Sequence, residues 1–278
     1  MAIITLTTDF GEKDHYAGTI KGEIYSELPD AKIVDISHSV SPFNIPEAAY
    51  IIFNAYSSFP KGTIHLIGID SELNRENKHI ALKLDGHYFI CANNGIMSMI
   101  CAEIVPEKIV EINIHDKIQT SFPVLDVFVR VACHIARGGT LEVIGKATDT
   151  IKPIRDLVPF VNEEKNQIIG SVIYIDNYGN VITNIKRKFF KDIGKGRSFE
   201  VHARNYKFTT IFNKYSDIID FDIPREKRNV EGKGIVVFNS GNYLEIAVYK
   251  GNPDNVGSAS TLMGLNPRDT VTVNFLDK

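Results

Sequence analysis

The first half of the chain alternates short apolar runs, typical of strands, with stretches whose apolar residues recur every three or four positions, as in amphipathic helices. The predicted helices span residues 16–26, 46–59, 95–104 and 124–137, and the predicted strands are Ile3–Leu6, Lys32–Ile36, Thr63–Ile69, His79–Leu84, Tyr88–Ala92 and Lys108–Ile112. Asp85-Gly86 lies between two of these strands and is a hairpin signal, so we expect a mixed sheet. The pattern predicts a layered α/β domain at residues 1–150.

The pattern changes after residue 150. Periodicity gives way to prolines and charged residues, so residues 151–168 are predicted to link two domains. In residues 169–278, Gly, Asn, Asp and Pro separate short β-rich runs, which are Ser171–Ile175, Val181–Ile185, Ser198–Val201, Tyr206–Ile211, Gly234–Phe238, Tyr243–Val248 and Thr270–Phe275. Such runs are typical of a small barrel or sandwich. The predicted fold class is α/β, with an N-terminal layered α/β domain containing a mixed sheet and a C-terminal β-barrel-like domain.

Composition favours a small-molecule partner. The 278 residues are 44% hydrophobic and carry 31 basic and 34 acidic side chains without a long like-charge block, so neither nucleic acid nor a membrane is an expected partner. The N-terminus lacks the features of a signal peptide, and the expected location is cytoplasmic. The three cysteines, Cys91, Cys101 and Cys133, lack metal-ligand spacing, so we expect no metal site and interpret them as small buried hydrophobes.

Polar residues cluster where predicted strands end. The chain has no Gly-rich phosphate loop, GxSxG, HExxH or CxxC motif. It has instead four polar clusters, at residues 9–14, 68–71, 92–95 and 176–180. Each is a plausible turn, with Asp14 as a helix N-cap. Because ligands bind beyond the carboxyl ends of strands in open α/β sheets, the clusters together also predict a shared pocket.

Four phrases in these regions carry a resemblance to a known family. They are TTDFG at 7–11, ANNG at 92–95, YIDNYGNVITNI at 174–185 and FNSGNYLEIAVYKGN at 238–252. In this order, and over nearly the whole chain, the sequence resembles the S-adenosylmethionine (SAM) hydroxide adenosyltransferases, relatives of fluorinases and chlorinases. The resemblance implies an α/β N-terminal domain and a barrel-like C-terminal domain. It also implies a homotrimer whose active sites lie at subunit interfaces.

The resemblance further implies a set of substrate-binding residues, which are Asp9, Asp14, Phe43, Asn94, Asp176, Tyr178, Asn180 and Ser240. In the N-terminal half, Asp9 would accept hydrogen bonds from both ribose hydroxyls, a task that suits an acceptor-only carboxylate. Asp14 would face the methionine ammonium. Phe43 would pack on the sugar and sulfur region.

The C-terminal half would supply the remaining contacts. By the same resemblance, Asp176 would meet the methionine amine and Ser240 the methionine carboxylate. Asn180 would read the polar edge of adenine, and Tyr178 would offer its ring to the face of the base.

The catalytic residues are only partly matched. Asp70 aligns with the aspartate of the Asp, Arg and His set that surrounds the water in the family's hydrolases. The expected arginine is Asn77 here, and the expected histidine is Pro123. Three alternatives remain: Arg75 or Lys78 supplies the cation, Asp70 activates water alone, or the activity is weak or absent.

The resemblance implies hydrolysis of SAM to adenosine and L-methionine by attack of water at the ribose 5′ carbon, with no cofactor because SAM is the substrate. The alternatives are a non-catalytic adenosine- or SAM-binding protein and a SAM-dependent halogenase that forms 5′-halo-5′-deoxyadenosine. A carboxylate ~4 Å from a halide repels it by about 4 kcal/mol at an effective dielectric constant near 20, roughly a thousandfold in occupancy. An ionised Asp70 facing the nucleophile therefore favours water over halide.

Overall fold

The computed structural model describes residues 2–101, 104–114, 120–154 and 158–276. The chain divides into two compact units, residues 1–154 and 155–278. The predicted link at 151–168 is therefore divided: its first four residues belong to the first unit, while a short strand, β8 (Phe160–Val161), and the start of β9 (Gln167–Ile175) belong to the second. A two-residue strand is too short to give a periodic signal.

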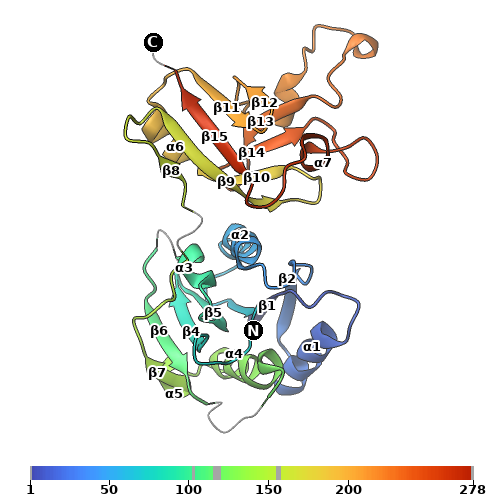
Figure 1. Cartoon of the computed structure of the whole chain (residues 1–278). Coiled ribbons are helices and arrows are strands. Elements are labelled where there is room, and N and C mark those ends of the chain that lie inside the picture. Colours follow the sequence, from blue (N-terminus) through green and yellow to red (C-terminus); the bar gives the residue numbers. More distant parts are fainter. Residues whose placement is uncertain (1, 102–103, 115–119, 155–157, 277–278) are drawn as a thin grey trace. The chain divides into compact units, whose positions relative to one another are not determined.

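The N-terminal unit is built on a mixed sheet in the order β2-β1-β3-β5-β4-β6-β7 (Figure 1). Its strands are β1 (Ile3–Thr8), β2 (Lys32–Ser37), β3 (Ile64–Gly68), β4 (His79–Leu84), β5 (His87–Ala92), β6 (Lys108–Ile112) and β7 (Gly145–Ala147). The pairs β2–β1, β1–β3 and β3–β5 are parallel, and the pairs β5–β4, β4–β6 and β6–β7 are antiparallel. Asp85 and Gly86, with φ of +48° and +74°, connect β4 to β5, which confirms the predicted hairpin and mixed sheet.

Helices cover both faces of this sheet (Figure 1). They are α1 (Tyr16–Glu27), α2 (Ile45–Tyr56), α3 (Ile96–Ile100), a π-helix (Val124–Phe128), α4 (Val129–Ala136) and α5 (Leu141–Ile144). Ile20 of α1 and Val131 of α4 share one buried core, and Ile52 of α2 and Ile96 of α3 share the other. Because both faces are covered, the central strands β1 and β3 are buried along almost their whole length and not only at alternate residues.

Some predicted boundaries are wrong. The helix expected at 95–104 is only five residues long, and α5 and β7 were not predicted because such short elements show no clear period. The first helix begins at Tyr16 with His15 as its N-cap, so Asp14 is not the cap residue. Asp14 instead lies exposed in the turn before the helix.

The C-terminal unit is an antiparallel, barrel-like sheet in the order β12-β11-β15-β9-β10-β14-β13, with β8 paired to β9 (Figure 1). Its further strands are β10 (Val181–Lys186), β11 (Phe199–Ala203), β12 (Tyr206–Phe208), β13 (Gly234–Phe238), β14 (Tyr243–Val248) and β15 (Thr270–Phe275). Val172, Leu244 and Val273 are part of its core. The sequence analysis missed two α-helices of this unit, α6 (Arg187–Gly194) and α7 (Ala259–Met263), and two short 3₁₀-helices, Tyr215–Ile218 and Arg225–Lys227.

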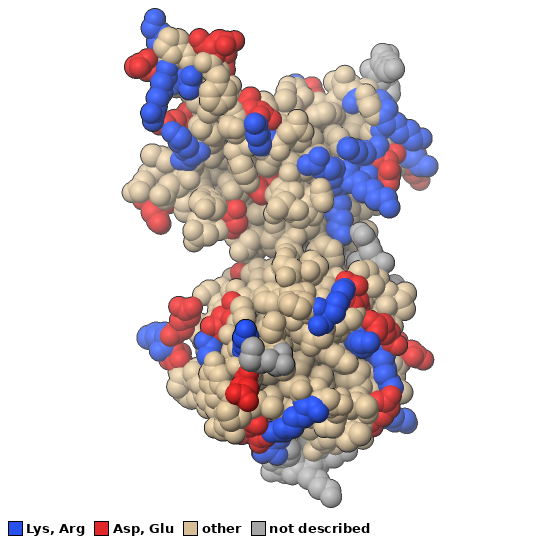
Figure 2. Space-filling model, turned by 180° about the vertical axis from the view of Figure 1, so that it is seen from behind, with Lys and Arg blue, Asp and Glu red and all other residues tan. Residues whose placement is uncertain are grey.

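Charged side chains of both signs are mixed on one face of the N-terminal unit. On the face of the N-terminal unit seen in Figure 2, Lys and Arg side chains are interspersed with Asp and Glu side chains. Of the helices in the described residues, none has the length and apolar character needed to cross a membrane. Cys91 and Cys133 are buried, Cys101 is half-buried, and all three are free thiols.

A buried histidine pair lies on β3 and β5. The Thr5 hydroxyl is 2.7 Å from His65 Nδ1, and His65 Nε2 is 3.2 Å from His87 Nδ1. The rings of Tyr56 and Phe89 pack against His65, with centroids 6.2 and 4.7 Å away. Burial, and to a smaller extent the charge of His87, lower the pKa of His65 to about 3.

This pair predicts a loss of stability in acid. The pKa of His65 is about 3 in the folded protein and 6.5 in its reference state, so its contribution is complete above pH 6.5 and is lost as the pH falls toward 3. The free energy of unfolding should decrease by about 1.4 kcal/mol for each pH unit below the unfolded pKa. His65→Gln should shrink the difference in urea midpoint between pH 7 and pH 5. The exposed His15→Gln is the control, and equal differences in both variants and the wild type would contradict the assignment.

Candidate functional site

The register of two parallel strands brings the first two polar clusters together. Thr8, the last residue of β1, is opposite Gly68, the last residue of β3. Asp9 and Asp70 therefore leave the sheet at neighbouring positions on the same edge. A Cβ atom on Gly68 would lie 3.1 Å from Phe10 Cζ, so a larger residue would push the two turns apart.

His38, the residue after β2, holds the TTDFG turn through two hydrogen bonds. The Thr8 hydroxyl is 2.7 Å from His38 Nδ1, and Gly11 N–H donates to the His38 carbonyl oxygen at 2.7 Å. Gly11 has a φ of +71°, a conformation that glycine adopts without strain. These bonds fix the backbone on both sides of Asp9.

The Asp9 carboxylate lies within electrostatic reach of a second carboxylate, that of Asp70. Its Oδ2 accepts a hydrogen bond of 2.8 Å from the Phe43 N–H, in a turn where Phe43 has a φ of +61° and a ring that is 72% exposed. Burial raises the pKa of Asp9, the N–H groups of Phe43 and of Asp9 itself oppose this, and the negative charge of Asp70 raises the pKa further. A cation between the two carboxylates would relieve their repulsion.

Asp9, Phe43 and Asp70 line one cavity of about 520 Å³ in the N-terminal unit, together with Phe10, Tyr16, Pro42, Ser71, Glu72, Thr120, Ser121, Phe122 and Pro123. Phe10, Tyr16 and Phe122 form its aromatic wall, with pairwise ring centroids 5.3 to 5.7 Å apart. Lys, Arg and His are absent from the described residues that line it. The lining thus combines carboxylates, hydroxyls and aromatic rings, which suits a cationic, partly apolar ligand.

Glu72 is a lining residue that the sequence analysis missed. Its only sequence signal is its place two residues after Asp70. Across the described residues, no group of three or more His, Cys, Asp or Glu side chains is arranged to hold a metal ion.

The positions of the missing arginine and histidine have other surroundings. Asn77 Oδ1 accepts a hydrogen bond of 3.0 Å from Lys152 Nζ. Pro123 lines the cavity and is the residue before the π-helix; π-helical turns are frequent at functional sites. In the same loop, the Thr120 hydroxyl donates to the carboxylate of Asp126, and Phe122 N–H donates to Thr120 Oγ1 at 2.8 Å.

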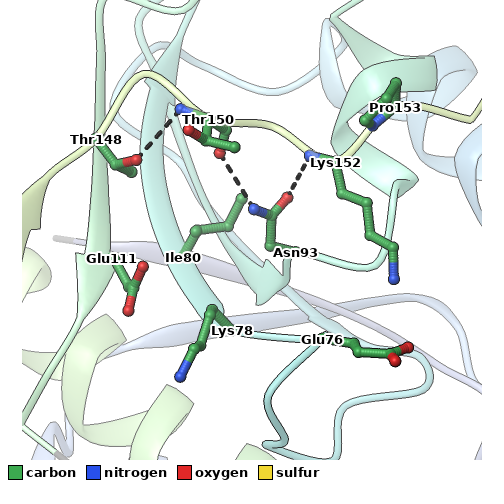
Figure 3. A pocket seen from close by; sticks show the side chains of 9 residues that line it. All are labelled: Glu76, Lys78, Ile80, Asn93, Glu111, Thr148, Thr150, Lys152 and Pro153. Atoms are coloured by element: carbon green, nitrogen blue, oxygen red, sulfur yellow. Dashed lines mark hydrogen bonds between the residues drawn. The ribbon is translucent and has the colours of Figure 1, made fainter.

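The two alternative cations lie outside the lining of this cavity. Arg75 is exposed in the loop between β3 and β4. Lys78 lines a second cavity, of about 560 Å³, together with Glu111 and Lys152 (Figure 3). Figure 3 also shows the amide of Asn93 bonded to the stretch 148–154: it donates to the Thr150 carbonyl oxygen at 3.1 Å and accepts from Lys152 N–H at 2.8 Å.

Asn94 and Asp14 are not among the lining residues. Asn94 is only 6% exposed, and its side chain binds backbone groups near Asp70. Asp14 is exposed in the turn before α1. Their implied contacts with substrate stay predictions.

The Asp176 turn is a self-contained structure in the C-terminal unit. Asp176 Oδ1 accepts from the N–H groups of Tyr178 and Asn180 at 2.9 and 2.8 Å, and Oδ2 accepts from Asn180 Nδ2 at 3.0 Å. A hydrogen bond of 3.0 Å from Ser260 N–H to the Gly179 carbonyl oxygen ties the turn to α7. The turn therefore presents the ring of Tyr178, which is 67% exposed, and leaves Asn180 buried.

Ser240 is exposed in the hairpin between β13 and β14. The Asn239 side chain shapes this hairpin by accepting from the N–H groups of Gly241 and Tyr243 at 3.0 and 3.1 Å. Glu245, two residues into β14 from Tyr243, is a buried carboxyl that the sequence analysis missed, although a glutamate in an apolar strand was its available signal.

Glu245 is 3% exposed, and its Oε1 accepts from the Tyr215 hydroxyl at 2.5 Å. Burial raises the pKa of Glu245, hydrogen bonds from Tyr215 and Asn239 oppose this, and the charge of Asp176 raises it further. The carboxyl thus interacts with both the Asp176 turn and the Ser240 hairpin.

Known structures share this fold. A crystal structure of a conserved protein from Thermotoga maritima superposes with a TM-score of 0.81, at 29% identity, over 98% of this chain and 99% of that one. One from Thermus thermophilus superposes with a TM-score of 0.72, at 22% identity, over 99% and 100% of the two chains.

Named relatives are similar over nearly the full length. An (R)-S-adenosyl-L-methionine hydrolase from Methanocaldococcus jannaschii is 30% identical over 98% of this chain and 95% of its own. A protein of the same name from Salinispora tropica is 26% identical over 97% of both chains. A fluorinase from Actinopolyspora mzabensis is 23% identical over 88% and 90% of the two chains.

Family models match both halves of the chain. The model of the SAM hydroxide adenosyltransferase N-terminal domain matches residues 4–145, and that of the C-terminal domain matches residues 170–272. Together with the two units of the fold and the full-length relatives, these matches show that the chain belongs to the SAM hydroxide adenosyltransferase family.

Proposed function

We propose that this protein hydrolyses SAM to adenosine and L-methionine by attack of water at the ribose 5′ carbon. The observation that carries the proposal is the cavity lined by Asp9 and Asp70, with carboxylates and without a cationic side chain among its described lining residues. The full-length relatives named (R)-SAM hydrolase support the same reaction. The (R) sulfonium form is the substrate that we propose for this chain as well.

Charge explains why this cavity suits SAM. The sulfonium centre is cationic, whereas adenosine is neutral and methionine has no net charge at neutral pH. Burial and, to a smaller extent, the charge of Asp70 raise the pKa of Asp9, and a nearby cation would offset both effects. The attraction ends when the sulfonium becomes a thioether, so the products are held less tightly than the substrate.

Positioning is the main task in the reaction. A water oxygen forms a bond to the 5′ carbon, the bond from this carbon to sulfur breaks, and its electron pair stays on sulfur. Because the leaving group is a neutral thioether, no general acid has to protonate it. The water proton passes to the carboxylate of Asp70, which then returns it to solvent.

This mechanism accounts for the unmatched residues. The arginine and histidine that the resemblance implies would surround the water; here Asp70 alone supplies the proton acceptor, so the mechanism assigns no step to positions 77 and 123. Glu72 adds negative charge to the same lining. An anionic nucleophile such as chloride or fluoride is therefore disfavoured, and water is the expected nucleophile.

We further propose a homotrimer with active sites at subunit interfaces. Support comes from the resemblance to the family and from the location of the implied methionine- and adenine-binding residues Asp176, Asn180 and Ser240 in the C-terminal unit, whereas Asp9 and Asp70 belong to the N-terminal unit. The cytoplasmic location stays a prediction.

Isotopic labelling tests the reaction. With SAM as substrate in ¹⁸O-labelled water, the adenosine formed should carry the label at its 5′ oxygen at the level of the solvent, and methionine should carry none. Added chloride or fluoride should leave adenosine as the nucleoside product. Unlabelled adenosine would contradict attack by water, and calorimetric binding of SAM without any adenosine would indicate the non-catalytic alternative.

Two matched substitutions separate chemistry from binding. Asp70→Asn should lower kcat by about a hundredfold or more, as for the loss of a general base, with a KM close to that of the wild type. Asp9→Asn should weaken the binding of adenosine and SAM by tenfold to a hundredfold, because Asp9 is the implied ribose ligand. This factor is roughly the free energy lost when hydrogen bonds to a charged acceptor are removed. Steady-state kinetics and calorimetry measure both, and a larger kcat effect for Asp9→Asn than for Asp70→Asn would reverse these roles.

Sedimentation velocity tests the assembly. The wild-type protein should sediment as a species of three times the chain mass of 31.1 kDa, because the resemblance implies a trimer in which neighbouring subunits share each site. A monomer that hydrolyses SAM at a concentration-independent specific activity would contradict the interface sites.

A further inference from the structure

The turn that carries Asp70 has an uncommon backbone. Asp70 has a φ of +43°, in the left-handed region that non-glycine residues rarely adopt. Such a conformation persists only where the surrounding structure fixes it. The carbonyl oxygens of three consecutive residues, Ile69, Asp70 and Ser71, accept hydrogen bonds from side chains outside the turn.

Asn94 holds the first two of these carbonyls. Its Nδ2 donates to the oxygen of Ile69 at 2.9 Å and to that of Asp70 at 3.4 Å. Its Oδ1 accepts from Ile96 N–H at 3.2 Å, at the start of α3. Because both ends of the side-chain amide are hydrogen-bonded and the residue is buried, the amide of Asn94 is held in one orientation.

His79 holds the third carbonyl. His79 Nε2 is 2.9 Å from the oxygen of Ser71. Because a carbonyl oxygen can only accept, Nε2 carries the proton and donates it. The ring is 1% exposed and packs edge-on against Phe128, with ring centroids 4.8 Å apart, so it comes from the sheet side of the turn and not from the cavity.

We propose that Asn94 and His79 are positioning residues that aim the Asp70 carboxylate at the attacking water. The inference rests on the proposed SAM hydrolysis. Asn94 lies just after β5, and His79 is the first residue of β4. From these two elements they hold the Asp70 turn on both sides of Asp70. In a reaction whose catalysis is mostly alignment, a displacement of the carboxylate by about 1 Å can lower the rate by about a hundredfold.

The chain offers a matched control next to Asn94. Asn93 has the same side chain and also bonds backbone groups through both ends of its amide, but its partners are Thr150 and Lys152 in the stretch 148–154 (Figure 3). Asn93→Ala and Asn94→Ala therefore remove equivalent bonds from adjacent positions. Only Asn94→Ala frees the carbonyls at Asp70.

The experiment compares kinetics and amide exchange in these variants. Asn94→Ala should lower kcat for SAM by tenfold to a hundredfold and change KM less than threefold, while Asn93→Ala should keep kcat within twofold. Hydrogen–deuterium exchange of the peptide that contains Asp70 should become faster in Asn94→Ala only. His79→Gln keeps a hydrogen-bond donor near the position of Nε2, so it should retain most of the kcat that His79→Leu loses. If Asn94→Ala does not fold, these two His79 variants test whether the Asp70 turn has to be held in place.

Three results would overturn the inference. They are equal kcat losses in Asn93→Ala and Asn94→Ala, an unchanged kcat in a folded Asn94→Ala, or equal losses in His79→Gln and His79→Leu. A wild-type protein that forms no adenosine would refute the proposed function and the catalytic role of the turn together. In that case exchange still shows whether Asn94 holds the turn, so the two failures are distinguishable.

Discussion

The placement of two carboxylates, those of Asp9 and Asp70, in the lining of one cavity is the constraint on which the candidate site depends. Burial raises the pKa of Asp9, and the negative charge of Asp70 raises it further. The fold opposes separation on both sides. His38 and the Phe43 N–H hold the Asp9 turn, and Asn94 and His79 hold the Asp70 turn.

This support comes from the sheet. The parallel register of β1 and β3 sets the spacing of the two turns, and Gly68 lets Phe10 approach the end of β3. The rigid part of the site is therefore buried and includes the polar side chains of His38, His79 and Asn94, while the groups that would contact substrate lie just beyond the ends of the strands. The carboxylates in this lining would attract the cationic sulfonium of SAM.

Sequence patterns predicted most of the fold because long elements have clear periods. The Asp85-Gly86 hairpin, the mixed sheet and the β-rich second half are confirmed, whereas α6, α7 and the short β7 were missed. In the site, the sequence placed Asp9 and Asp70 correctly at strand ends. It offered only weak signals for Glu72 and Glu245, namely a place close to Asp70 and a place in an apolar strand, because a single acidic residue is more often a solvated surface group.

By itself, the sequence determined the order of the longer elements, the family and the residue types available for binding. These follow from local periodicity and from ordered motifs, which need no knowledge of distant contacts. Only the tertiary structure decided that Lys78 and Arg75 lie outside the lining of the Asp70 cavity, and that the two asparagines of ANNG bind different segments. The physical reason is that side-chain direction in a turn depends on backbone angles and on hydrogen-bond partners far away in the chain.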